Sequence, residues 1–299
     1  MLQINSGKLY QRGVGRRNQL RGVLYTNLNL RGIDEPIATQ AGTLLPADSR
    51  HNPNTVVYEL VEQMETDLVA PGVLISHTVE PYLQDFSAVL AFTLRVICTP
   101  DADLASRLLS GRRSLAVLTP PSKLLRRIFD QQVWCQKDDA VELVSFVQKL
   151  IGLERRSFLA AMRAIRTYVT GLHRVVDDLE LAYTLLVASM ESLAQDFDAH
   201  DATWSDIEEA KRNAVDKALE GSEESLAQRV RGALIAVEHV ALARRFREFV
   251  LDHLEPRYFR EGAVGRAGAL GRSDLSDALQ EAYNLRSRYI HNLRTLPHL

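Results

Sequence analysis

Near the end of the chain lies the stretch Tyr283-Asn284-Leu285-Arg286-Ser287-Arg288-Tyr289-Ile290-His291-Asn292, which is predicted to form the late part of a helix. At about 100° per residue, one narrow stripe of this helix consists of Leu275, Leu279, Ala282, Arg286, Tyr289 and Leu293. Arg286 therefore stands where an apolar residue is expected. Because an unpaired buried charge is costly, this guanidinium needs a partner from another part of the fold.

The hydrophobic pattern of nearly the whole chain after about residue 120 predicts further helices. The segment from Asp177-Asp178 to Asp196 is apolar on almost all faces, which is typical of a central, buried helix. Its only polar wedge contains Thr184 and Glu191. The other predicted helices span Lys123–Phe129, Asp139–Leu150, Glu154–Leu172, a segment from a Ser205–Glu208 capping box to Leu219, Leu226–Leu254, and a last helix capped by Ser273.

The first hundred residues instead predict short strands. From Leu24 to Leu30, apolar and polar residues alternate between glycines, which indicates a half-buried strand. Thr55–Val61, Val73–Val79 and Ser114–Leu118 are further strand candidates. The apolar segment from Tyr82 to Ile97 fits either a helix or a buried strand. Asp101 is expected to cap a short helix.

These patterns predict an α+β protein, with a mixed strand-containing N-terminal domain followed by an all-α helical bundle. We expect a strand-containing domain over residues 1–135, connecting helices over 136–174 and a helical domain over 175–299.

The composition is that of an ordinary globular protein, with 299 residues, 46% hydrophobic and 25% charged. The formal net charge of −2 means that any contact with RNA must depend on a local basic patch. The candidate patch contains Arg107, Arg112, Arg113, Lys123, Arg126 and Arg127. Cys98 and Cys135 are far apart in the sequence, which favours a reducing cytoplasmic location and argues against a cysteine-ligated metal. We expect no signal peptide, membrane span, metal site or cofactor.

Arg286-Ser287-Arg288-Tyr289-Ile290-His291 resembles the Arg-x4–6-His signature of the HEPN superfamily, the higher eukaryote and prokaryote nucleotide-binding domains. HEPN domains are helical bundles that carry this signature on a late helix. The earlier helix around Met190-Glu191-Ser192-Leu193 is also similar to theirs, and a β-containing module before the bundle resembles Apea-like HEPN proteins. The likeness covers about residues 175–296.

The resemblance implies a metal-independent endoribonuclease, acting as a toxin or antiphage abortive-infection effector. Arg286 and His291 of two protomers would line a cleft across a symmetric homodimer. In such a cleft the histidine would move protons at the ribose 2′-OH and the 5′-oxygen, and the arginine would hold the phosphorane charge. The N-terminal domain would be a sensor that receives a regulatory partner or trigger.

Four further residues are expected to support the site or bind RNA: Ser287, Arg288, Asn292 and Glu191. Two positions depart from the family pattern. Ser287 stands where family members commonly have Asn, Asp or His, and Leu293 replaces the tyrosine of members silenced by a partner nucleotidyltransferase. The alternative interpretation is therefore a non-catalytic HEPN-like module that binds nucleotide or RNA, or that holds a dimer together.

Overall fold

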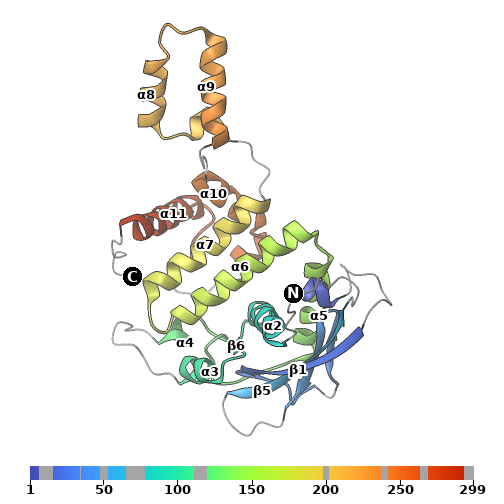
Figure 1. Cartoon of the computed structure of the whole chain (residues 1–299). Coiled ribbons are helices and arrows are strands. Elements are labelled where there is room, and N and C mark those ends of the chain that lie inside the picture. The colour runs from blue at the N-terminus through green and yellow to red at the C-terminus, as the bar shows by residue number, and fades with distance from the viewer. Residues whose placement is uncertain are drawn as a thin grey trace. The chain divides into compact units, whose positions relative to one another are not determined.

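The structure is a computed structural model of the chain that describes residues 1–6, 16–33, 35–47, 53–64, 78–110, 120–197, 202–237, 242–262 and 269–292. Two compact units divide within one helix, between Leu186 and Val187. The fold is mixed: an antiparallel sheet near the N-terminus is followed by a helical C-terminal region, so the α+β prediction is confirmed. Figure 1 shows both parts of the chain.

In the first unit, five strands form an antiparallel sheet in the order β3-β4-β5-β1-β6. The strands are β1 (Arg16–Thr26), β3 (Ile37–Thr39), β4 (Gly42–Pro46), β5 (Asn54–Met64) and β6 (Cys98–Thr99). The long β1–β5 pair is its centre, and Leu24 lies opposite Val56. Both of these side chains are buried, as period-two alternation requires when one face of a sheet is covered.

Helix α2 (Glu80–Leu94) covers that buried face and settles the Tyr82–Ile97 ambiguity in favour of a helix (Figure 1). The rings of Phe86 and Tyr58 stack with centroids 4.3 Å apart. A Cβ atom at Gly22 would lie 2.6 Å from Leu83 Cδ1, so the missing side chain allows β1 and α2 to approach closely.

The other helices of this unit are α1 (Leu2–Asn5), α3 (Ala102–Leu109), α4 (Pro121–Leu124), α5 (Lys137–Gly152) and α6 (Arg155–Arg174). Helices α5 and α6 both pack against α2. The helices predicted as a connection over 136–174 therefore belong to the first unit by its contacts. Asp101 caps α3 as expected, accepting hydrogen bonds from the backbone N–H groups of Asp103 and Leu104.

The predicted strand from Leu24 to Leu30 is interrupted at Asn27. Strand β1 ends at Thr26, and β2 (Leu28–Asn29) pairs in parallel with β7 (Val133–Trp134). Asn27 was expected on the polar side of a half-buried strand, but it is fully buried. Its amide donates to the carbonyls of Ile128 and Asp130 and accepts from the N–H of Ile97. Satisfied hydrogen bonding explains why a polar side chain is tolerated there.

Helix α7 (Leu179–Phe197) spans the division between the units. Past it, the second unit contains α8 (Glu209–Ala218), α9 (Glu224–Val237), α10 (Leu242–His253) and α11 (Leu275–Asn292). Helices α10 and α11 pack together around Phe246, which is fully buried, and Leu275 and Leu279 of α11 are buried as the stripe predicts.

Several local predictions were wrong. Lys123–Phe129 is not one helix, since α4 ends at Leu124. The capping box belongs to Thr203 and Asp206 around a 3-10 turn, not to Ser205 and Glu208. The predicted long helix Leu226–Leu254 is helical on both sides of residues 238–241, as α9 and α10, and those four residues lie outside the described ranges, so its continuity stays a prediction. The strand candidate Ser114–Leu118 and nearly all of Val73–Val79 also lie outside them.

Candidate active site

Helix α11 carries both residues of the Arg-x4-His pattern in one continuous helical backbone. Arg286 lies in its penultimate turn, and its side chain is 20% exposed. His291 and Asn292 are the last two helical residues; their side chains are not among those the structure describes. Arg286 and His291 are therefore about 7.5 Å apart along the axis and about 140° apart around it.

Arg286 finds the partner that its position in the apolar stripe demands. Its Nη2 lies 3.0 Å from Oε2 of Glu191, whose side chain is only 5% exposed on α7. Thr184 and Glu191, the polar wedge of α7, are both buried. The pair thus joins two residues that the sequence marks as anomalous, a charged residue in the apolar stripe of α11 and an acidic residue in the polar wedge of α7.

Two opposing effects act on the pKa of Glu191: its burial and its polar partners. Burial raises the pKa of the Glu191 carboxyl above its ordinary value, while Arg286 and a hydrogen bond from Gln195 act in the opposite direction. Gln195 Nε2 donates to Glu191 Oε1 at 3.2 Å. The net pKa shift remains upward, so the pair is held in a site of low polarity where charge interactions are strong.

Tyr283 is a neighbour of this pair that the sequence interpretation missed. Burial raises the pKa of its phenol, and the nearby Glu191 charge raises it further. Its ring lies 6.1 Å from that of Phe246, centroid to centroid. The available signal was its spacing: Tyr283 precedes Arg286 by three residues and so lies on the same side of the helix.

One guanidinium nitrogen of Arg286 is unsatisfied. Its Nε is buried and has no hydrogen-bond partner among the described residues. A buried donor without a partner is uncommon in folded proteins.

The remaining predicted site residues are less enclosed. Ser287 is half-buried, and Arg288 is exposed. Arg288 Nη2 lies 4.0 Å from Glu281 Oε1, a weak contact between two exposed side chains. The structure thus joins Arg286 with Glu191 and does not extend that cluster to Arg288.

Two arginines of the basic patch proposed from the sequence form ion pairs within the protein. Arg107 pairs with Asp177, and Arg127 pairs with Asp139 while also donating to the Leu94 carbonyl. Arg112 and Arg113 lie outside the described residues. Two members of the patch thus have structural partners, which weakens it as a surface for RNA.

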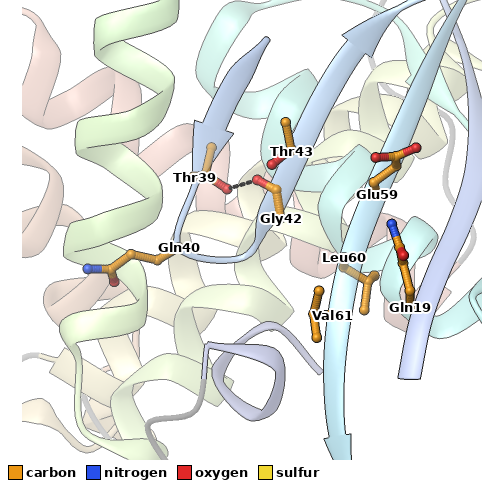
Figure 2. A pocket seen from close by; sticks show the side chains of 8 residues that line it. All are labelled: Gln19, Thr39, Gln40, Gly42, Thr43, Glu59, Leu60 and Val61. Atoms are coloured by element: carbon orange, nitrogen blue, oxygen red, sulfur yellow. Dashed lines mark hydrogen bonds between the residues drawn. The ribbon is translucent and has the colours of Figure 1, made fainter. Parts of the chain in front are cut away.

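A surface cavity of about 300 Å³ lies on the sheet, beside the β3–β4 turn (Figure 2). Its lining residues are Gln19, Thr39, Gln40, Gly42, Thr43, Glu59, Leu60 and Val61. Thr39 Oγ1 donates to the Gly42 carbonyl at 2.7 Å, and Arg21 Nε lies 3.1 Å from Glu59 Oε1. Among the described residues that line this cavity there is no histidine, cysteine or predicted site residue.

Within the described part of the chain, no cluster of three or more His, Cys, Asp or Glu side chains could hold a metal ion. None of the described helices combines the length and apolar character needed to cross a membrane. Comparison of the chain with protein-family models, curated proteins and solved structures finds no match.

Proposed function

We propose that this protein is a metal-independent endoribonuclease of the HEPN type, a homodimeric cytoplasmic effector of the toxin or antiphage class. The observation that carries the proposal is the Arg286–Glu191 pair. It holds the arginine of the Arg-x4-His pattern in a largely buried site on α11, five residues before His291.

In this proposal, Arg286 binds the reacting phosphate. A guanidinium has five donors, and the contact with Glu191 occupies one end of the group. The guanidinium donors that Glu191 does not engage are assigned to an anionic oxygen of the substrate. Charge-assisted hydrogen bonds in a site of low polarity stabilise the charge that develops on a phosphorane. Glu191 positions the arginine and does not itself contact the substrate.

His291 supplies proton transfer. An imidazole titrates near pH 6.5, so it can take the proton of the 2′-OH and return one to the leaving 5′-oxygen. Attack by the 2′-oxygen on the adjacent phosphorus expels the 5′-oxygen and leaves a 2′,3′-cyclic phosphate. Ser287, Arg288 and Asn292 flank these residues and are assigned to RNA binding. The N-terminal unit is assigned to sensing a trigger or partner.

A second candidate is a non-catalytic HEPN-like module that binds nucleotide or RNA, or that stabilises a dimer. It is favoured by a specific observation: Arg286 is paired within its own chain, as a purely structural arginine would be. Ser287 in place of the usual Asn, Asp or His points the same way.

The test is an RNA cleavage assay in EDTA with purified protein, total RNA and tRNA. We compare the wild type with His291→Ala and Arg286→Lys. Lysine keeps a positive charge beside Glu191 but loses the planar fork of donors, so it tests phosphate binding without leaving the carboxylate unpaired. His253→Ala is the matched control for the histidine, because His253 is exposed near the end of α10.

We expect cleavage that is lost in His291→Ala, reduced at least about tenfold in Arg286→Lys, and unchanged in His253→Ala. The ends should carry 2′,3′-cyclic phosphates. Equal cutting by all four proteins would assign the activity to a contaminant or another site. Absence of cutting by a folded dimer, with RNA binding retained, would favour the non-catalytic module.

A further inference from the structure

A cavity of about 330 Å³ lies between the end of α10 and the start of α11. Its lining also includes Phe259 of the π-helical turn η3 (Tyr258–Gly262), which follows α10 in the chain. Helices α10 and α11 pack against each other, so the cavity lies within the second unit. Its volume is within the range of about 300 to 1,000 Å³ that is usual for small-molecule sites.

Most of the cavity wall is apolar. The apolar lining residues are Leu251, Leu254, Pro256, Phe259 and Leu275. Leu275 is buried, and the ring of Phe259 packs edge to face with that of Tyr258, with centroids 5.1 Å apart. This wall therefore offers a held aromatic ring and aliphatic side chains to the apolar part of a ligand.

Three polar side chains complete the lining: Asp252, Arg272 and Ser276. Asp252 and Arg272 are exposed, and Ser276 is half-buried. Within the part of the chain that the structure describes, none of these three side chains forms a hydrogen bond or an ion pair. Two opposite charges thus line one cavity without pairing with each other, and both keep their hydrogen-bonding groups for another molecule.

We propose that this cavity binds a free amino acid with an apolar side chain. A zwitterion carries both of the charges that the lining complements. Arg272 and Ser276 hold its carboxylate through charge-assisted hydrogen bonds, and Asp252 holds its ammonium group. The apolar side chain lies against Phe259 and the leucines of the wall.

The cavity is separate from the candidate active site. Ser276 precedes Arg286 by ten positions on α11, which is about 15 Å along the helix axis. The inference therefore goes beyond the proposed function and does not depend on nuclease activity.

The test is isothermal titration calorimetry of the full-length chain in the absence of RNA. The amino-acid probes are L-phenylalanine and L-leucine. Two fragments of phenylalanine separate the contributions of its charges: 3-phenylpropanoate lacks the ammonium group, and 2-phenylethylamine lacks the carboxylate. Adenosine monophosphate is the competing probe, because a guanidinium also binds phosphate. Each probe is titrated up to about 10 mM.

Arg272→Gln and Asp252→Asn each remove one charge from the lining. Their matched controls are Arg229→Gln on α9 and Asp277→Asn on α11, which remove the same charges at exposed positions outside the lining. Circular dichroism melting checks that all four variants remain folded. Because the four side chains are exposed, we expect melting temperatures close to that of the wild type.

We expect the wild type to bind phenylalanine or leucine with a dissociation constant below about 1 mM. Binding should weaken about fivefold or more in each lining variant and change by less than about twofold in the controls. Binding of 3-phenylpropanoate should not weaken in Asp252→Asn, and binding of 2-phenylethylamine should not weaken in Arg272→Gln. Each fragment lacks the group that the removed charge holds.

Three results would overturn the proposal. The folded wild type binds neither amino acid, or the lining variants bind them as tightly as the controls do. Alternatively, 3-phenylpropanoate binds as tightly as phenylalanine, which leaves no role for Asp252. Binding of adenosine monophosphate that depends on Arg272, without amino-acid binding, would assign the cavity to a phosphate ligand. The RNA cleavage assay is a separate measurement, so failure of this proposal and failure of the nuclease proposal are distinguished.

Discussion

At the scale of single residues, the protein depends on a few polar groups that are wholly or partly withdrawn from solvent. Asn27 and Glu191 are buried and held by named partners, and His173 is half-buried beside two arginines. Each links one side chain to a measurable change in stability, because the free energy of unfolding is sensitive both to a buried group that loses its partner and to a shifted pKa.

Asn27→Ala removes three hydrogen bonds at a fully buried position. Two carbonyls and one N–H lose their partner, so we expect the free energy of unfolding to fall by about 3 kcal/mol. Urea unfolding followed by circular dichroism measures this. Gln19→Ala, at an exposed position on β1, is the control and should change stability by less than about 0.5 kcal/mol.

Arg286→Ala leaves the buried Glu191 carboxylate without its cation. We expect a loss of about 2 kcal/mol at neutral pH, below the 3–5 kcal/mol of fully buried pairs because the guanidinium is partly exposed. The pKa of Glu191 is already raised by burial, and loss of Arg286 raises it further. A raised carboxyl pKa gives stability that is present at low pH and lost as the pH rises through the folded value.

The destabilisation of Arg286→Ala relative to the wild type should therefore be larger at about pH 7 than at about pH 4, near the ordinary value for a glutamate. Adding Glu191→Gln should recover part of the loss at neutral pH. If the difference between wild type and variant is independent of pH, the pair is not coupled as the geometry indicates. Arg229→Ala, exposed on α9, is the matched control.

His173 supplies a pH dependence of the opposite kind. Burial, with Arg107 and Arg174 nearby, lowers the pKa of its imidazole to about 4. In the unfolded chain it titrates near pH 6.5, so unfolding takes up a proton between these two values. The stability that His173 contributes is complete above about pH 6.5 and declines as the pH falls toward about 4.

His173→Gln should flatten the stability–pH curve in this window by about 2–3 kcal/mol, measured by urea unfolding at successive pH values. Curves that run parallel would show that another group titrates there.

At the scale of elements, tight backbone approaches position the strands. Gly42 has φ of +140°, and a Cβ there would lie 2.6 Å from the Glu59 carbonyl oxygen. The β3–β4 hairpin therefore requires glycine for both conformation and space. In contrast, the close approach of Gly22 to α2 involves only the flexible end of Leu83.

Gly42→Ala should destabilise the protein by about 2–3 kcal/mol, because strain in φ adds to a clash with backbone. Gly152→Ala is the control, since nothing lies within 4 Å of a Cβ at the end of α5. Thermal unfolding of the two variants gives the comparison. Equal melting temperatures of Gly42→Ala and Gly152→Ala would mean that the hairpin accommodates the alanine without loss of stability.

At the scale of the whole molecule, the proposed chemistry needs two copies of the chain. A single α11 places Arg286 and His291 about 140° apart, so one helix does not present both to the same phosphate without a facing partner. We expect light scattering to give twice the 33.6 kDa mass of the chain. Specific activity should fall on dilution below the dimer dissociation constant.

Mixing provides a sharper test of the shared cleft. The Arg286→Lys protein, which is impaired, and the His291→Ala protein, which is inactive, should together cleave faster than either alone when they are mixed under conditions that exchange subunits. In the mixed dimer one chain supplies the histidine and the other the arginine. No recovery, with subunit exchange shown by a labelled chain, would mean that each site is built within one chain.

The sequence by itself determined the α+β order of elements, the burial of Leu275 and Leu279, and the need of Arg286 for a partner. These follow from periodicity and from the cost of burying charge, which are local properties. It also singled out Glu191, because an acidic residue in an otherwise apolar helix is itself anomalous. Only the tertiary structure decided that α2 is a helix and that Asn27 is buried. These outcomes depend on contacts between segments that are far apart in the sequence. The spacing of residues along the chain does not show which of these segments will meet.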